Sequence, residues 1–96
     1  MKSIINNDKK CFICGSTANL HLHHVMFGRN RKIADEDGLT LYLCYFHHEG
    51  TYGVHGLNGH DLDIKLKKIA EEKWCKFYNK SINQFIKRYG KNYIDE

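Results

Sequence analysis

Four side chains with metal-binding atoms stand in two closely spaced pairs in the first half of the chain. Cys11 and Cys14 form a C-x-x-C pair, and Cys44 and His47 form a C-x-x-H pair. Each pair offers two ligands from one short turn, and four sulfur and nitrogen ligands suit tetrahedral Zn²⁺. We therefore predict a closed, structural zinc site. The alternative is a set of buried reduced cysteines beside a surface histidine.

Histidines crowd the same half of the chain. The segment HLHHV contains His21, His23 and His24, and His48 directly follows His47. Hydrolysis of a phosphodiester needs an open metal site, with positions for water and phosphate, and a base that deprotonates the water. We expect His23, His24 and His48 to divide these tasks. Neighbours in a regular strand point to opposite faces, so His23 and His24 share a site only where the strand bends or ends.

Two alternating segments are expected to position these side chains. Residues 20–25 (LHLHHV) alternate leucine with histidine, which is the period of a half-buried strand. Residues 39–43 (LTLYL) alternate leucine with threonine and tyrosine in the same way. A loop from Phe27 to Gly38 joins the two segments, and together they predict a hairpin.

The second half of the chain has a helical pattern. Asp61 is placed to cap a helix whose apolar face recurs at Leu62, Leu66, Ile69, Ala70, Trp74 and Phe77. Ser81 and Gln84 form a capping-box pattern for a last helix, which Gly90 closes.

Length and composition limit the classes of protein to consider. The chain has 96 residues, of which 42% are hydrophobic, so it suits one small globular domain that gains from a metal staple. No apolar run approaches the ~18 residues of a membrane span, and the first residues lack a secretory signal. We therefore expect a cytoplasmic protein with reduced cysteines and no membrane partner. The net charge of +4 suits a polyanion, although solvated lysine-rich helices explain the same surplus.

The order of the motifs resembles that of the HNH endonucleases, also called ββα-metal nucleases. That family shows a C-x-x-C knuckle, a strand ending in His-His or Asp-His, a loop, a second strand running into LC, and a helix that starts with C-x-x-C-H or similar. The matching segments here are Cys11-x-x-Cys14, LHLHHV at 20–25, LYLC at 41–44, and Cys44-x-x-His47-His48. The C-x-x-H-H ending followed by GVHG is more similar to small phage-borne members, including RecA-dependent recombination-enhancement nucleases, than to colicins.

This resemblance implies a fold class and a domain organisation. The fold would be a small α+β domain, in which a zinc-stapled hairpin and helix form the ββα-metal motif and one or two C-terminal helices follow. The single nuclease domain would span residues 1–96, with the zinc knuckle and ββα core in 11–59 and a helical extension in 61–90. A phage or prophage origin is implied as well.

The resemblance also assigns roles to individual residues. His23 and His48 would ligate a catalytic divalent metal such as Mg²⁺, Mn²⁺, Ni²⁺ or Zn²⁺, with His55 as a further candidate ligand. His24 would be the general base that activates water for hydrolysis of DNA phosphodiester bonds. The middle asparagine, which helps to orient the base in this family, has no clear counterpart, which leaves Asp37 or Thr40 as substitutes.

Basic residues suggest where nucleic acid would bind. Arg29, Arg31 and Lys32 lie in the segment between the two strands, where they could grip the phosphates of double- or single-stranded DNA. A row of lysines at positions 65, 68, 76 and 80 would extend this contact without sequence specificity.

Two other functions remain open at this point. The chain could be a catalytically inactive, zinc-stabilised nucleic-acid-binding module. It could also be a structural zinc domain whose helical half docks on a phage or recombination protein. Metal stoichiometry separates them, because a nuclease would bind a second divalent ion more weakly than its zinc, whereas both alternatives need only the zinc.

Overall fold

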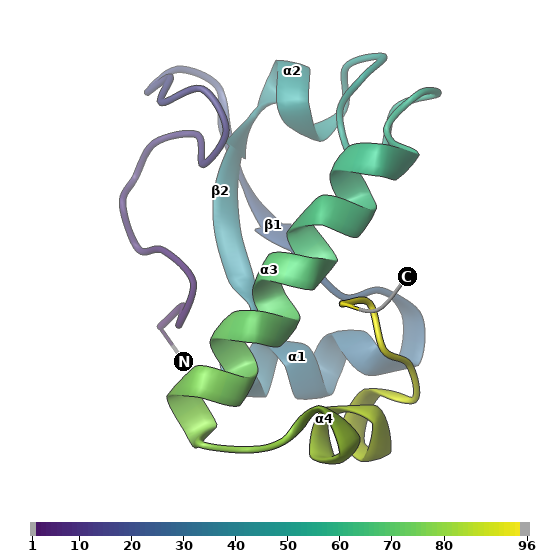
Figure 1. Ribbon diagram of the computed structural model, residues 1–96. Coiled ribbons are helices and arrows are strands. Elements are labelled where there is room, and N and C mark those ends of the chain that lie inside the picture. Colours follow the sequence, from purple (N-terminus) through teal and green to yellow (C-terminus); the bar gives the residue numbers. More distant parts are fainter. Residues whose placement is uncertain (1, 95–96) are drawn as a thin grey trace.

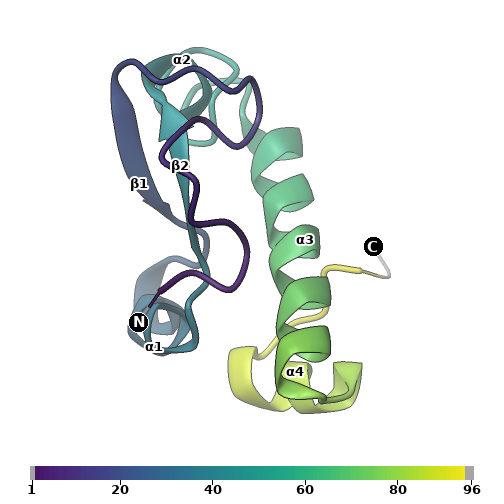
Figure 2. The same cartoon turned by 90° about the vertical axis from the view of Figure 1, so that its left-hand side faces the viewer.

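A computed structural model describes residues 2–94 of the chain, so residue 1 and residues 95–96 lie outside the described part. The elements are β1 (Leu20–His24), a 3₁₀ helix η1 (Gly28–Asn30), α1 (Arg31–Asp37), β2 (Thr40–Cys44), α2 (Tyr45–His48), α3 (His60–Tyr78) and α4 (Ile82–Tyr89). The two strands pair antiparallel. Helix α3 runs beside the hairpin (Figures 1 and 2). Helix α2 lies toward one end of α3, and α4 lies at the other end of α3. The chain therefore has a small α+β fold, and the hairpin with α2 makes a ββα-like unit.

The two strands of the hairpin differ in how well their pattern predicted burial. Leu39, Leu41 and Leu43 are fully buried, as the alternation at β2 predicted. In β1 the exposure is the reverse of what the leucines suggest, since Leu22 is 47% exposed and His23 only 1%. The imidazole of His23, and not the leucine, therefore faces the interior. A buried polar ring needs a partner, which makes this position a candidate for function.

Helix α1 occupies the segment that we expected to be a loop. The loop prediction was wrong because the stretch RKIADED is built largely from residues that favour helix. Gly38 ends the helix with φ +84°, and its N–H donates to the carbonyl oxygens of Ala34 and Asp35. A Cβ atom at Gly38 would lie 2.6 Å from the carbonyl oxygen of Lys2, so both the backbone conformation and the close approach require glycine here.

Helix α3 begins one residue earlier than its predicted cap. Gly59 is the N-cap, and Asp61 lies in the first turn, where its charge favours the helix dipole without capping it. Leu66, Ala70 and Trp74 are buried as predicted, but Phe77 is 58% exposed. Tyr78 packs against the core in its place. No helix in residues 2–94 is both long enough and apolar enough to cross a membrane.

Helix α4 confirms the capping-box prediction. The Gln84 N–H donates to Ser81 Oγ, and the Ser81 N–H donates to Gln84 Oε1. Gly90 closes the helix with φ +84°. Phe85 and Tyr89 are buried against Trp74, with ring centroids 5.4 Å and 6.2 Å away from it. Aromatic packing therefore anchors α4 on the far end of α3.

Candidate metal centres

Cys11, Cys14, Cys44 and His47, hereafter the Cys/His cluster, lie together, each with a ligand atom within 4.8 Å of the others. The Sγ atoms of Cys14 and Cys44 are 3.8 Å apart, and His47 Nδ1 lies 3.3 Å from Cys44 Sγ and 3.7 Å from Cys11 Sγ. Tetrahedral zinc with Zn–S bonds of about 2.3 Å requires S···S separations of about 3.8 Å. This cluster could therefore bind a metal ion such as zinc.

The backbone around Cys11 prepares the Cys/His cluster for a cation. The Cys11 N–H donates to Ser16 O at 2.8 Å, and the Phe12 N–H donates to Tyr42 O at 2.9 Å, so the knuckle is fixed against β2. Burial raises the pKa of the Cys11 thiol, but hydrogen bonds from backbone N–H groups, that of Cys14 foremost, outweigh burial and lower the pKa to about 6. A thiol with so low a pKa is readily available as thiolate, the form that binds metals.

Three histidines from different parts of the chain, hereafter the histidine cluster, form a second group that could hold a metal ion: His23, His48 and His55. Their ring centroids are 5.2 Å (His23–His48), 5.5 Å (His23–His55) and 4.7 Å (His48–His55) apart. His23 Nε2 is buried and has no hydrogen-bond partner among the residues that the structure describes. An unpaired buried polar atom costs roughly 1–3 kcal/mol, and a bound cation would remove that cost. The donor set therefore fits a divalent ion.

Electrostatics favour the neutral form of two members of the histidine cluster, His23 and His48. Burial lowers the pKa of His23 to about 3, and repulsion from His48, His55 and Lys67 acts in the same direction. Burial also lowers the pKa of His48, again with a contribution from His55. Neutral imidazoles offer the nitrogen lone pairs that a metal ion needs.

A glycine-rich loop brings His55 back to the cluster after α2 has ended at His48. The His55 N–H donates to His48 O at 2.9 Å, and the Val54 N–H donates to His47 O at 3.0 Å. The loop folds so tightly that a Cβ atom at Gly56 would lie 1.8 Å from the carbonyl oxygen of Gly50. The backbone approach that places His55 therefore requires glycine at position 56.

His24 stands at the end of β1 with its ring held by an acid. The Nδ1–H of His24 donates to Asp35 Oδ1 at 2.8 Å, which leaves Nε2 with its lone pair exposed for proton transfer. Neither residue suggested by the sequence makes this contact. Asp37 lies on another side of α1 and accepts hydrogen bonds from Trp74 and Arg88 instead. Thr40 lies opposite His24 in the antiparallel pairing of β1 with β2. Asp35 was missed because the helix that carries it was read as a loop.

An open pocket of about 280 Å³, hereafter the first pocket, connects these groups. His24, His48 and His55 line it together with Arg31, Leu22, Phe27 and Gly28. Of the three basic residues expected to contact DNA, Arg31 therefore reaches the pocket. Arg29 and Lys32 are exposed nearby, in η1 and α1, without lining it.

Lys67 and His21 make contacts whose partners the sequence alone did not identify. Lys67 is 6% exposed, and its Nζ donates to Asp63 Oδ1 at 2.5 Å and lies 3.8 Å from the centroid of the Phe27 ring. Its signal in the sequence was its position seven residues before Trp74, which places both on one face of α3. His21 Nδ1 lies 3.0 Å from His48 Nδ1, and with the His48 Nδ1–H as the donor, His48 keeps the lone pair of Nε2 for a metal ion.

His21 also lies 3.6 Å from Glu49 Oε2, measured from Nδ1. Together with His48, these two residues form a third group that could hold a metal ion. This group is half-exposed and overlaps the histidine cluster at His48.

Comparisons of the chain with protein-family models, with curated proteins and with solved structures gave no significant match.

Proposed function

We propose that the chain is a metal-dependent endonuclease of the HNH type that hydrolyses DNA phosphodiester bonds. One observation carries this proposal: His24, oriented by Asp35, lines the same 280 Å³ pocket as His48 and His55 of the histidine cluster. Phosphodiester hydrolysis needs a base and a metal site side by side. The resemblance of the sequence motifs to this family points to the same reaction.

The residues around the first pocket divide the work as follows. Asp35 accepts the Nδ1 hydrogen of His24, and His24 Nε2 takes the proton from a water molecule that attacks the phosphorus atom. Arg31 lines the pocket and places positive charge beside the phosphate. His23, His48 and His55 would hold a divalent cation, and that cation would supply positive charge to offset the charge on the phosphate and on its leaving oxygen.

The rest of the chain supports these roles. The Cys/His cluster ties the segment before β1 to α2, and α2 presents His48 to the first pocket. The net charge of +4, with Arg29 and Lys32 exposed near the pocket, favours contact with the phosphates of DNA. A phage or recombination protein as a further partner follows only from the resemblance.

A nicking assay tests the proposal. Zinc-loaded protein is incubated with supercoiled plasmid and Mg²⁺, Mn²⁺ or Ni²⁺, or without added metal. We expect metal-dependent nicking that His24→Ala lowers by roughly 10²–10⁴-fold, because the base is lost. His60→Ala is the matched control, since His60 is exposed and lies outside both clusters.

Two results would contradict the proposal. Nicking that is equally fast in His24→Ala would remove the base from the mechanism. Intact plasmid with every metal, together with a salt-sensitive gel shift, would instead identify a zinc-stabilised DNA-binding module.

A further inference from the structure

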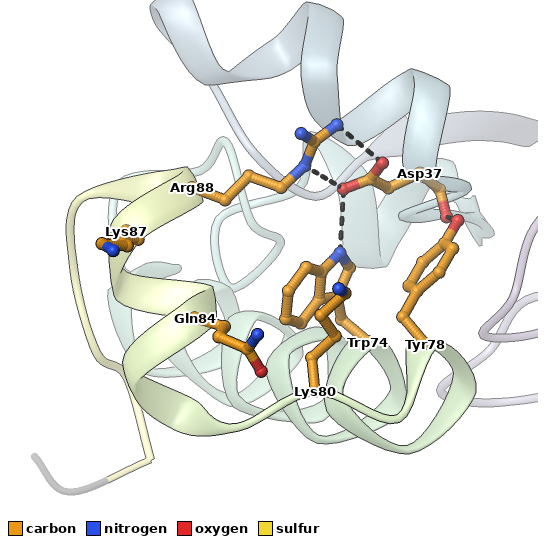
Figure 3. Close-up of a pocket in the computed structure, with 7 residues that line it drawn as sticks. All are labelled: Asp37, Trp74, Tyr78, Lys80, Gln84, Lys87 and Arg88. Atoms are coloured by element: carbon orange, nitrogen blue, oxygen red, sulfur yellow. Dashed lines mark hydrogen bonds and ion pairs between the residues drawn. The ribbon is translucent and has the colours of Figure 1, made fainter.

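A second pocket, hereafter the distal pocket, lies at the far end of α3 from α2. Its volume is about 370 Å³, and its lining comes from α1, α3, α4 and the turn between the last two helices (Figure 3). The two views of the fold place α4 at the opposite end of the molecule from α2 (Figures 1 and 2). No residue among those that the structure describes lines both this pocket and the first one. The nuclease mechanism makes no use of it.

The one acidic group in the distal pocket is already fully engaged. Asp37 Oδ2 accepts hydrogen bonds from Trp74 Nε1 at 2.8 Å, Arg88 Nε at 2.6 Å and Tyr89 OH at 2.5 Å. Asp37 Oδ1 accepts from Arg88 Nη2 at 2.8 Å. Figure 3 shows the carboxylate enclosed by the Arg88 and Trp74 side chains. Because its charge is matched by Arg88 and its oxygens are occupied, Asp37 does not repel an anion.

The other polar side chains of the lining offer donors. Lys80 and Lys87 are exposed ammonium groups, and the Arg88 charge is balanced by Asp37, so the lysines leave a net charge of +2. Gln84 uses its carbonyl oxygen to accept from the Ser81 N–H, which leaves its amide NH₂ group as a donor. Trp74 and Tyr78 provide an aromatic wall. A donor-rich, positively charged pocket of this size suits a phosphate group.

We propose that the distal pocket binds a phosphate ester, carried either by a DNA strand or by a small molecule. The possibility that a DNA strand carries the phosphate ester rests on the proposed function. Lys67 beside the histidine cluster and Tyr78 in the distal pocket are eleven residues apart on α3, which is about 16 Å along the helix axis. That distance equals about five nucleotide steps of a DNA strand. A strand that occupies both pockets must therefore be longer than a trinucleotide.

The only tryptophan of the chain reports binding at this pocket. Trp74 lines it, so its fluorescence emission should change when a phosphate enters. Zinc-loaded His24→Ala protein, without added catalytic metal, is titrated with inorganic phosphate and with an abasic deoxyribose-phosphate trimer and decamer, which lack absorbing bases. Sodium chloride at matched ionic strength is the blank. We expect a saturable emission change with each phosphate probe.

The three probes separate the two sources of phosphate. A decamer that binds about tenfold more tightly than the trimer supports a DNA strand as the ligand. Equal affinity for all three probes supports a small phosphate ester as the ligand and refutes a DNA strand as the ligand. Because the assay contains no cleavage step, it is independent of the nuclease proposal. A protein that fails to nick plasmid but binds phosphate here refutes the proposed function alone.

Paired lysine variants test the location. Lys80→Ala with Lys87→Ala should weaken phosphate binding by about tenfold or more, because both positive charges of the lining are lost. Lys9→Ala with Lys10→Ala removes the same charge from exposed positions in the N-terminal segment and should change affinity little. Thermal unfolding confirms that both variants fold. An equal loss in the two double variants, or no saturable change with any probe, overturns the proposal.

Discussion

Replacing Asp37 by asparagine tests the contact that holds α1 against α3 and α4. The Asp37 side chain is 12% exposed and accepts hydrogen bonds from Trp74, Arg88 and Tyr89. Asparagine keeps the size but turns an NH₂ group toward these donors. Breaking a buried ion pair costs about 3–5 kcal/mol. Because the Arg88 side chain is 38% exposed and regains water, we expect the lower value, about 3 kcal/mol.

Urea unfolding of the zinc-loaded protein, followed by tryptophan emission, measures this loss. For a chain of this size the same loss lowers Tm by roughly 12–24 °C. Asp35→Asn is the matched control, because Asp35 lies on the same helix but is 38% exposed, and it should cost less than about 1 kcal/mol. An Asp37→Asn variant that loses less than about 1 kcal/mol, or no more than the control, would refute this account of α4 docking.

Three further predictions concern the metal sites. Gly56→Ala forces the loop open, since its Cβ would lie 1.8 Å from a backbone oxygen, and should weaken Co²⁺ binding at the histidine cluster by about tenfold or more. Gly90→Ala also introduces backbone strain, at φ +84°, but at the end of α4, and it should leave Co²⁺ affinity unchanged. Equal affinities of the two variants would contradict this prediction. His21→Ala should weaken Co²⁺ binding at the histidine cluster roughly 10–100-fold. His21→Asn should restore part of the affinity, because its side-chain oxygen can accept from His48. Unchanged Co²⁺ affinity in His21→Ala would show that His21 does not orient His48. Removing metal from the Cys/His cluster with a strong chelator should unfold the chain, which circular dichroism measures, and a retained helical signal would argue against a structural zinc.

Local spacing in the sequence was enough to predict the features that one short segment encodes. The leucines of β2 alternate because one face of the strand is buried. Ser81 and Gln84 satisfy each other's backbone N–H across a single helical turn. The two ligands within each pair of the Cys/His cluster need only one turn that presents both side chains, whereas the meeting of the two pairs depends on the hairpin. Features of this kind depend little on the rest of the fold.

Other features depend on which distant segments meet, and the sequence pattern could not predict them. The inward position of His23 follows from the loop and helix that surround its ring, whereas the alternation of β1 alone favoured its leucines as the buried side. Asp35 reaches His24 only because α1 folds back beside β1. Lys67 approaches the same region from α3, more than forty residues away in the sequence. Tertiary packing decides all three positions.

The adjacency of His47 and His48 in the four-residue helix α2 would couple the binding of metal ions at two sites that share no ligand. His47 belongs to the Cys/His cluster and His48 to the histidine cluster, so the conformational entropy lost in fixing this one turn serves both. An ion bound at one cluster would therefore raise the affinity of the other cluster for its ion, and by reciprocity the two effects would be equal in free energy. Oxidation of the cysteines would remove thiolate ligands from the Cys/His cluster and so weaken metal binding at the histidine cluster as well. If the proposed nuclease activity is confirmed, it would thus follow the thiol redox state of its surroundings.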